Sequence, residues 1–288
     1  MTMQGKICLI TGGTNGIGKS TAQELARRGA TVVIVGRNTQ KTAQVVKEIR
    51  AASGNKNVDS LLADLSSQQE VRHLANEFKS RYSYLHVLLN NAGGVFMQRH
   101  LSVDGIEMTF ALNHLAYFLL TNLLLDTIKA SPTARIINVS SNVHNSGKIE
   151  FDNLQGERDY SASAYGNSKL ANILFTTELA QRLEGTGVTV NALHPGFVST
   201  GFGKNNPGLL MKIIRAVVPL IARSPEKGAE TSIYLASSTS VEGITGKYFY
   251  DSHMIPAAPQ ATDMAVAKKL WDVSAEMVHL TDAVPEMA

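Results

Sequence analysis

Residues 6–20 read "KICLITGGTNGIGKS", and this stretch indicates how the fold begins. The apolar run at 6–11 is typical of a buried strand, and a helical pattern follows the glycines. Glycines between a strand and a helix let the backbone turn sharply, while the helix start offers N–H groups to an anion such as pyrophosphate. The spacing Gly12-x-x-x-Gly16-x-Gly18 differs from the usual G-x-G-x-x-G, so a tight turn without a ligand remains an alternative.

Beyond this stretch, short β-branched runs alternate with longer helical patterns. This alternation predicts right-handed β–α–β crossovers and a parallel sheet, and strands that are apolar throughout predict helices on both faces. No Ser/Pro/Gly-rich linker divides the chain, which favours a single domain over 1–288 with a core at about 6–250. The predicted fold is α/β, a single-domain Rossmann-type doubly wound sheet of about seven parallel strands. The strands are expected at 6–11, 31–36, 58–63, 86–90, 134–140, 188–194 and 246–250, and the helices at 17–28, 39–52, 67–81, 105–130, 162–184 and 225–237.

The composition excludes several classes of protein. A net charge of +3, with basic residues spread along the chain, gives no reason to expect nucleic-acid binding. A single cysteine, Cys8, forms no internal disulfide, so a reducing compartment is expected and a thiolate metal site is not. The first apolar run is too short for a signal peptide or a membrane span, which favours a cytoplasmic protein without stable membrane insertion. The apolar stretch at 208–222 is interpreted as a helix covering a pocket, with a membrane-touching helix as the alternative.

The end of the second strand bears on the cofactor that the glycine loop would bind. A carboxylate there would bind the adenosine ribose 2′-hydroxyl of NAD. This chain has "VVIVGRN" (32–38), with no acid and with Arg37 directly after the strand. Because a guanidinium suits a 2′-phosphate, NADP(H) is expected in preference to NAD(H). The alternative is that Arg37 is only a solvated loop charge.

The stretch "AYGNSKLANILF" (164–175) reads as helix and places Tyr165 four residues before Lys169. Residues at this spacing can share one face of a helix. A nearby ammonium lowers the pKa of a phenol, ordinarily about 10, and makes it a usable acid or base. The same spacing also arises on the solvated side of an amphipathic helix, so the pair needs the context of other motifs.

Several further motifs stand in one order along the chain. "TGGTNGIG" is followed by Asp64 in "ADL", "NNAG" (90–93), Asn113 in "ALNHLAYF", "NVSS" (138–141), "YGNSK" (165–169) and "HPGFVST" (194–200). Together they resemble the short-chain dehydrogenase/reductase superfamily from residue 6 to about 250. The segments 135–160, 164–196 and 268–277 resemble its retinol dehydrogenase-like subgroup, which includes the WW-domain oxidoreductases.

The resemblance implies a catalytic tetrad of Asn113, Ser141, Tyr165 and Lys169. Tyr165 would exchange a proton with the substrate oxygen, Ser141 would donate a hydrogen bond to the developing alkoxide, and Asn113 would hold a water in the proton relay behind Lys169. Ser140 is the alternative to Ser141, since neighbouring strand residues face opposite sides and only one of the two can reach the substrate. The alternative for Asn113 is a capped or solvent-facing asparagine without a catalytic role. The resemblance further implies cofactor contacts from Gly12, Thr14, Asn15, Gly16, Ile17, Gly18, Arg37, Asn38, Asp64, Leu65, Asn91, Ala92, Gly93, Tyr165, Lys169, Pro195, Gly196, Val198 and Thr200.

The segment before Tyr165 is longer than the minimal family pattern, and residues 144–160 are expected to form a substrate loop. Residues 201–224 are expected to form a lid, and 251–288 a helical tail that carries Trp271. His114, His144 and His194 are interpreted as structural. A mostly apolar substrate pocket is expected from the following side chains, unless several of them only pack the lid: Phe96, Met97, Phe151, Leu154, Phe202, Met211 and Ile214.

The function that follows is hydride transfer between NADP(H) and a hydrophobic ketone or aldehyde, or the corresponding alcohol. A dinucleotide-sensing regulator without turnover is the alternative. A sugar-nucleotide epimerase fits less well, because the chain has little room for a longer carboxy-terminal domain, and Cys8 is poorly placed for the chemistry of a light-dependent protochlorophyllide reductase. Family members often pair through the helices at 105–130 and 162–184, so a homodimer is one expectation, although the tail could block a tetramer contact.

Overall fold

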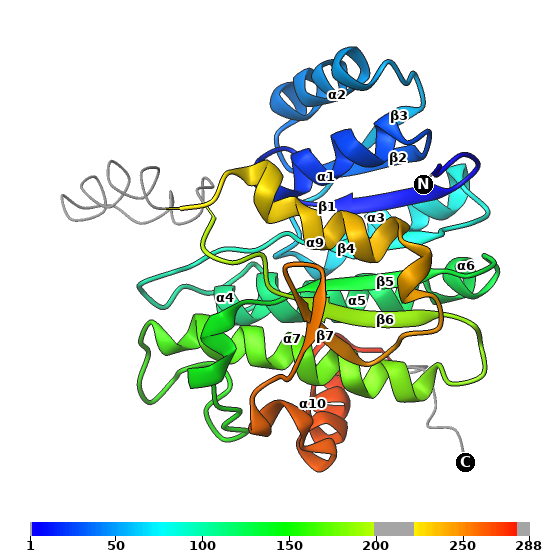
Figure 1. Ribbon diagram of the computed structural model, residues 1–288. Coiled ribbons are helices and arrows are strands. Elements are labelled where there is room, and N and C mark those ends of the chain that lie inside the picture. Colours follow the sequence, from blue (N-terminus) through cyan, green and yellow to red (C-terminus); the bar gives the residue numbers. More distant parts are fainter. Residues whose placement is uncertain (1, 199–221, 281–288) are drawn as a thin grey trace.

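The computed structural model describes residues 2–198 and 222–280, and these residues are built around one twisted sheet (Figure 1). The strand order is β3-β2-β1-β4-β5-β6-β7-β8. Every neighbouring pair from β3 to β7 is parallel, and β8 is antiparallel to β7. The strands are β1 (Ile7–Thr11), β2 (Thr31–Gly36), β3 (Val58–Leu62), β4 (Val87–Asn90), β5 (Arg135–Val139), β6 (Thr189–Leu193), β7 (Lys247–Tyr250) and β8 (His253–Ile255).

The predicted set of seven parallel strands is confirmed, and β8 is an eighth strand that the prediction lacked. β8 is joined to β7 by Asp251 and Ser252, whose φ angles of 50° and 64° are those of a two-residue hairpin turn. The three residues of β8 show neither alternation nor a β-branched run, so their pattern does not indicate a strand.

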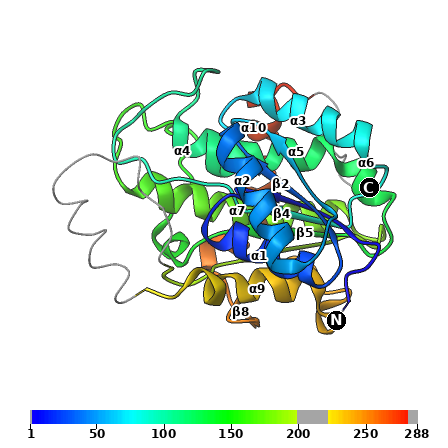
Figure 2. The same ribbon diagram turned by 90° about the horizontal axis from the view of Figure 1, so that it is seen from above.

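Helices cover both faces of the sheet, as expected for a doubly wound fold (Figure 2). Successive side chains of a strand point to opposite faces. Thus Cys8 and Ile10 of β1 pack with the helices α1, α2 and α9, whereas Leu9 packs with α3, α5, α7 and α10. The helices are α1 (Gly16–Arg27), α2 (Thr39–Ser53), α3 (Gln68–Arg81), α4 (Met108–Phe110), α5 (Ala116–Leu123), α6 (Leu125–Lys129), α7 (Ser163–Arg182), α9 (Pro225–Ser237) and α10 (Met264–Met277).

The single helix expected at 105–130 is wrong as one continuous element. The chain forms α4, then a π-helical turn at Ala111–Leu115, then α5 and α6. A π turn contains one more residue than an α turn and is frequent at functional sites. It shifts the side chains that follow it around the helix axis, and it contains Asn113.

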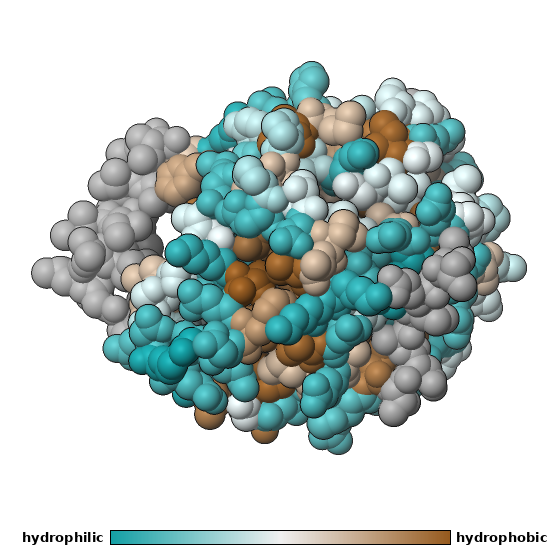
Figure 3. Space-filling view, turned by 90° about the horizontal axis from the view of Figure 1, so that it is seen from below, coloured by the Kyte–Doolittle hydropathy of each residue, from teal (hydrophilic) through white to brown (hydrophobic). Residues whose placement is uncertain are grey.

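The tail after β8 folds back over α7. A 3₁₀ turn at Pro259–Thr262 and then α10 pack against α7, so residues 264–277 of the expected tail are helical, whereas 253–255 form β8. In Figure 3, which views this side of the molecule, apolar residues gather in the middle of the face and hydrophilic residues surround them. None of the helices in residues 2–198 and 222–280 is long and apolar enough to cross a membrane.

Candidate active site

Tyr165 and Lys169 lie in the first two turns of α7, at the carboxyl edge of the sheet. Lys169 is only 3% exposed, and its Nζ lies 5.6 Å from the centre of the Tyr165 ring. The same Nζ donates a hydrogen bond to the carbonyl oxygen of Val139, at 3.0 Å. Val139 is the last residue of β5, so this bond ties the lysine to the strand end that carries the two serines. The ammonium and the phenol therefore share one face of the helix, next to the sheet edge.

The two serines that follow β5 point in different directions. Ser140 is buried, and its hydroxyl donates to the carbonyl oxygen of Lys169 at 2.7 Å. Ser141 is partly exposed, and its hydroxyl forms a hydrogen bond with the phenol of Tyr165. Strand alternation separates the pair in this way. Of the two hydroxyls, that of Ser141 faces the phenol.

Asn113 is fully buried in the π-helical turn, so it is neither solvent-facing nor a cap. Its Oδ1 accepts from the Gly94 N–H at 2.8 Å, and its Nδ2 donates to the Gly94 carbonyl at 2.9 Å. The Nδ2 also donates to the Ser168 hydroxyl at 3.0 Å, which joins the turn to α7. A side-chain carbon on Gly93 would lie 3.0 Å from Asn113 Oδ1 and 3.6 Å from Lys169 Nζ. Asn113, Gly93 and Lys169 are thus brought together.

Burial dominates the electrostatics of the pair. It raises the pKa of Tyr165 to about 12, and the hydrogen bond from Ser141 acts in the opposite direction. Burial also lowers the pKa of Lys169 to about 7. Near neutral pH the pair therefore loses its first proton, and that proton comes from the lysine. The neutral phenol is therefore the main form of Tyr165 near neutral pH, as a proton donor requires.

The glycine loop forms a close approach between β1, α1 and β4. Gly12 and Gly16 have φ angles of 65° and 51°, a region that glycine enters without strain. A side-chain carbon on Gly18 would collide with the Gly12 carbonyl oxygen and lie 2.6 Å from Asn91 Nδ2. Asn15 precedes α1 without making a capping hydrogen bond, and the first turn of α1 has no acid. The start of α1 thus offers backbone N–H groups, as a pyrophosphate site requires.

Asn91 holds the ends of β1 and β4 together. Its Nδ2 donates to the Thr11 carbonyl at 2.8 Å, and the N–H groups of Asn91 and Ala92 donate to the Thr11 hydroxyl at 2.8 and 3.0 Å. These bonds place Ala92 against Gly12, where a side-chain carbon on Gly12 would lie 3.0 Å from Ala92 Cα. The NNAG segment therefore forms one wall of the glycine loop.

The residues expected near the adenosine lie after β2 and β3. Arg37 and Asn38 are exposed, and Asn38 caps α2 through a 2.9 Å bond from the Lys41 N–H. Thr14 of the glycine loop lies close to Gly36, at the end of β2. The carboxylate of Asp64 accepts from the N–H and hydroxyl of Ser66, at 3.0 and 2.7 Å, so it shapes its own turn. Leu65, directly after Asp64, is buried.

The loop after β6 carries Pro195, Gly196 and Val198 to the start of α1. A side-chain carbon on Gly228 of α9 would lie 2.6 Å from Val198 Cγ2 and 3.3 Å from Ile17 Cγ1. Val198 and Ile17 therefore both lie against Gly228, so the loop after β6 packs beside the glycine loop. Thr200 lies outside the described residues, as do 201–221 of the expected lid, with Phe202, Met211 and Ile214, and all but the last residue of the 208–222 stretch.

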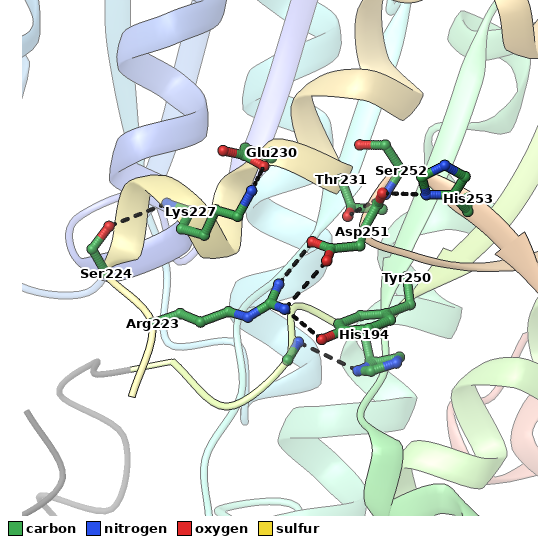
Figure 4. Close-up of polar contacts among 11 residues, drawn as sticks. His194, Arg223, Ser224, Lys227, Glu230, Thr231, Tyr250, Asp251, Ser252 and His253 are labelled. Carbon is green, nitrogen blue, oxygen red and sulfur yellow. Dashed lines mark hydrogen bonds and ion pairs between the residues drawn. The ribbon is translucent and has the colours of Figure 1, made fainter. Parts of the chain in front are cut away.

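Three residues that sequence reasoning missed support this loop (Figure 4). Arg223 donates to both carboxylate oxygens of Asp251, at 2.7 and 3.2 Å, and to the Tyr250 hydroxyl at 2.6 Å. Tyr250 stacks on His194, with ring centres 4.1 Å apart and planes 7° apart. A side-chain carbon on Gly196 would lie 3.3 Å from the Arg223 side chain. The signal was missed because the bonds of Arg223 join the end of the expected lid to a hairpin that the prediction lacked.

The histidines interpreted as structural are buried and bonded. Burial lowers the pKa of His114 and of His194 to about 4 in each case, so both rings are neutral at physiological pH. His114 Nε2 shares a 2.9 Å hydrogen bond with the Ser274 hydroxyl of α10. His144 lies in the 3₁₀ turn at Asn142–Ser146 that directly follows Ser141.

The expected substrate loop at 144–160 is held in place at its far end. The Tyr160 hydroxyl bonds to the Phe96 carbonyl and to the Glu107 carboxylate, both at 3.0 Å. Between this loop and α7 lies a cavity of about 290 Å³, lined by Leu154 and Tyr160 and mostly by polar groups. Phe151 packs on the hydrophobic core instead, beneath Lys269 of α10. Phe151, one of the side chains expected to line an apolar pocket, thus contributes to packing instead.

Comparisons with known proteins find relatives that are similar to this chain over most of its length. The model of the short chain dehydrogenase family matches residues 6–207. Retinol dehydrogenase 11 of Homo sapiens is 42% identical over 279 residues, which cover 96% of this chain and 87% of that protein. The crystal structure of an uncharacterised protein from Mycobacterium paratuberculosis is similar with a TM-score of 0.79 and 30% identity, over 99% of this chain and 96% of that one. The active-site complex of Pseudomonas aeruginosa RhlG with NADP has a TM-score of 0.67 and 29% identity, over 86% and 95% of the two chains.

Proposed function

This chain belongs to the short-chain dehydrogenase/reductase family, in its retinol dehydrogenase-like subgroup, and from that premise we propose that it uses NADP(H) to interconvert a hydrophobic carbonyl compound and its alcohol. Membership makes it a NAD(P)-dependent oxidoreductase that acts on CH–OH or C=O groups. The observation that carries the finer proposal is the convergence of Ser141, Tyr165 and Lys169 beside the glycine loop.

The residues present fit a dinucleotide. The glycines let the loop pack closely against Asn91 and Ala92, and the start of α1 is free of side-chain caps and so offers N–H groups to a pyrophosphate. Lys169 would donate to the nicotinamide ribose, and Pro195, Gly196 and Val198 would border the nicotinamide. Asp64, Leu65, Ala92 and Gly93 would border the adenosine side. When bound, the nicotinamide supplies or accepts the hydride.

Side chains of this protein would transfer the proton of the reaction. Tyr165 holds a proton on a phenol whose pKa is raised to about 12, and it would give that proton to the substrate oxygen during reduction. The Ser141 hydroxyl, which bonds the same phenol, would donate to the oxygen as negative charge develops on it. Lys169, when protonated, favours loss of the phenol proton, and Asn113 holds the backbone next to the lysine through Gly94.

The preference for NADP(H) is supported by the end of β2. Arg37 is exposed directly after Gly36, and the glycine loop residue Thr14 lies against the same glycine. No acid follows β2 to repel a 2′-phosphate. Arg37→Asp should therefore raise the KM for NADPH by at least roughly tenfold and leave the KM for NADH within about twofold. Lys41→Asp, which places an acid on the nearby α2, is the matched control, and an unchanged NADPH preference in Arg37→Asp would reject this role.

A hydrophobic substrate is supported by the surroundings of the pair. The segments that follow β4, β5 and β6 expose Met97, Val143 and Phe197, at 52%, 42% and 59%. Apolar side chains exposed around a polar reaction centre are typical of a site for a largely apolar ligand. The similarity to a retinol dehydrogenase agrees with this substrate class.

The test is steady-state turnover of a panel of ketones, aldehydes and alcohols that differ in size and polarity, with NADPH and NADH. We expect turnover that favours apolar substrates and NADPH. Tyr165→Phe should abolish turnover and leave NADPH binding, measured by fluorescence titration, within about twofold. Tyr84→Phe, at an exposed tyrosine remote from the site, is the matched control. NADPH binding without turnover of any substrate would instead support a dinucleotide-sensing regulator.

A further inference from the structure

The 3₁₀ turn at Asn142–Ser146 starts at Ser141 and is held by the ring of His144. His144 is 1% exposed, and its Nδ1 lies 2.8 Å from the Ser141 carbonyl oxygen. Its other ring nitrogen, Nε2, lies 3.1 Å from the backbone nitrogen of Ala258, in the segment between β8 and α10. One buried ring therefore joins the proposed catalytic serine to the carboxy-terminal tail.

The partners of His144 determine which nitrogen carries its proton. The backbone N–H of Ala258 can only donate, so Nε2 must accept, and the proton lies on Nδ1. The Nδ1–H then donates to the Ser141 carbonyl. Burial lowers the pKa of His144, which agrees with a neutral ring of this tautomer. The ring also meets Tyr248 of β7 edge-on, with centres 4.9 Å apart, so its orientation is fixed from a third side.

A side chain of the same tail segment, that of Gln260, also bonds this turn. The Nε2 of Gln260 donates to the carbonyl oxygen of Asn145 at 2.9 Å, and it lies 3.4 Å from that of Gly147. Carbonyl groups at the end of a short helix have no hydrogen-bond partners within the helix, so an amide donor from outside satisfies them. The tail therefore contacts the start of the turn, where the Ala258 N–H bonds His144, and the end of the turn, where Gln260 bonds Asn145.

We propose that residues 258–260 of the tail are part of the active site, and that His144 and Gln260 are positioning residues that fix Ser141 against Tyr165. This inference rests on the proposed function in taking Ser141 as the donor to the substrate oxygen. A donor on a short turn has few bonds of its own to hold it, and displacement by about 1 Å can cost a hundredfold in rate. The Ala258 N–H, which bonds the His144 ring, and the Gln260 amide supply further bonds from outside the strand and the turn.

The experiment compares four variants of the full-length protein. His144→Phe keeps the aromatic volume against Tyr248 but removes every hydrogen bond of the ring, including the 3.4 Å contact between Nδ1 and the Tyr248 hydroxyl. His144→Asn places an amide N–H near the position of Nδ1. Gln260→Ala removes the second contact. Gln68→Ala is the matched control, because Gln68 also donates to the tail, to the Met277 carbonyl at 2.9 Å, but far from Ser141.

We expect His144→Phe to lower kcat and kcat/KM for the carbonyl substrate equally, by roughly tenfold to hundredfold, with the KM for NADPH within about twofold. His144→Asn should recover part of this loss. Gln260→Ala should lower kcat several-fold, and Gln68→Ala should not lower it. Hydrogen exchange of the peptide at 139–147 should quicken in His144→Phe and Gln260→Ala but not in Gln68→Ala.

The exchange measurement needs no turnover, so the two hypotheses can fail separately. An inactive wild-type protein would count against the proposed function. Unchanged exchange at 139–147 in Gln260→Ala would overturn the positioning role, whether or not the wild type is active. Faster exchange with an unchanged kcat in Gln260→Ala would overturn it as well, and so would an equal loss of kcat in Gln68→Ala. Gln260 is partly exposed, so this variant is expected to fold even if His144→Phe does not.

Discussion

At the scale of single residues, burial shifts the pKa values of Tyr165 and Lys169 in opposite directions. The pKa of the phenol is raised to about 12 and that of the lysine is lowered to about 7, so burial by itself opposes the phenolate–ammonium form. The two groups titrate as a pair, and the state with one proton between them prevails above about pH 7. In this state the proton can lie on Lys169, which leaves a phenolate on Tyr165 that accepts a proton from an alcohol. Carbonyl reduction needs only the protonated phenol.

The first prediction concerns the pH dependence of the two directions. For alcohol oxidation, log kcat/KM should rise by about one per pH unit below pH 7 and level off above it, because the pair must first lose one proton. Carbonyl reduction should not rise with pH in this range. The measurement is kcat/KM in both directions from pH 5.5 to 9. In Lys169→Arg, whose guanidinium does not titrate here, the rise near pH 7 should vanish, and an identical profile in that variant would assign the step to another group.

The second prediction separates the two serines. Ser141→Ala should lower kcat by roughly a hundredfold, because its hydroxyl faces Tyr165. It should leave the free energy of unfolding within about 0.5 kcal/mol, because the capping bond that this hydroxyl accepts from the Val143 N–H is long, at 3.4 Å. Ser140→Ala should instead lower the free energy of unfolding by about 1 kcal/mol, because its buried hydroxyl bonds the Lys169 carbonyl. Kinetics and chemical denaturation of both variants check this. A larger loss of kcat in Ser140→Ala than in Ser141→Ala would reverse the assignment.

The serines also show what sequence could predict at this scale. Alternation along a strand implied that only one hydroxyl reaches the substrate, but it could not say which, since that depends on how β5 faces α7. The family pattern supplied the choice. The spacing of Asp64 and Ser66 allows an aspartate to bond the backbone two residues on, but the sequence alone did not distinguish this turn contact from a contact with the cofactor.

At the scale of elements, the strands were predictable and the middle helix was not. Most of the parallel strands read as short apolar runs rich in Val, Ile and Leu, the pattern of strands that are buried on both faces. The break at Ala111–Leu115 could not be located from the sequence, because only Asn113 and His114 interrupt its apolar, helix-forming residues and single polar residues also occur in regular helices. A π turn follows from tertiary bonds, here those of Asn113 to Gly94 and Ser168, and helix propensity does not contain them.

The third prediction concerns how α10 attaches to α7. Trp271 stacks on Phe175 with ring centres 5.8 Å apart, and the Arg182 guanidinium lies 4.3 Å from the centre of the Trp271 ring. Trp271→Ala should lower the free energy of unfolding by about 3–5 kcal/mol, whereas Asp272→Ala, at the exposed neighbouring position, should change it by less than about 0.5 kcal/mol. Denaturation is followed by circular dichroism, since Trp271 is the only tryptophan. Equal effects in the two variants would mean that α10 is held elsewhere.

At the scale of the whole molecule, α10 covers the surface on which family members were expected to pair. The expected pairing helices correspond to α5 and α7. Phe118 of α5 and Phe175 of α7 both pack on Trp271, with ring centres 4.8 and 5.8 Å apart. The chain's own tail therefore lies where a second subunit would dock, and what remains apolar on this side is surrounded by hydrophilic residues (Figure 3).

The fourth prediction follows from this cover. The full-length chain should not pair through α5 and α7, and light scattering after gel filtration should give the mass of one chain at micromolar concentration. A chain that ends after Thr262 lacks α10 and exposes the buried aromatic rings of α5 and α7, so it should associate as its concentration rises. A chain that ends at residue 280 keeps α10 and is the control. A full-length dimer cross-linked between the α7 helices of its two subunits would show that α10 moves aside, and the cover proposed here would then be wrong.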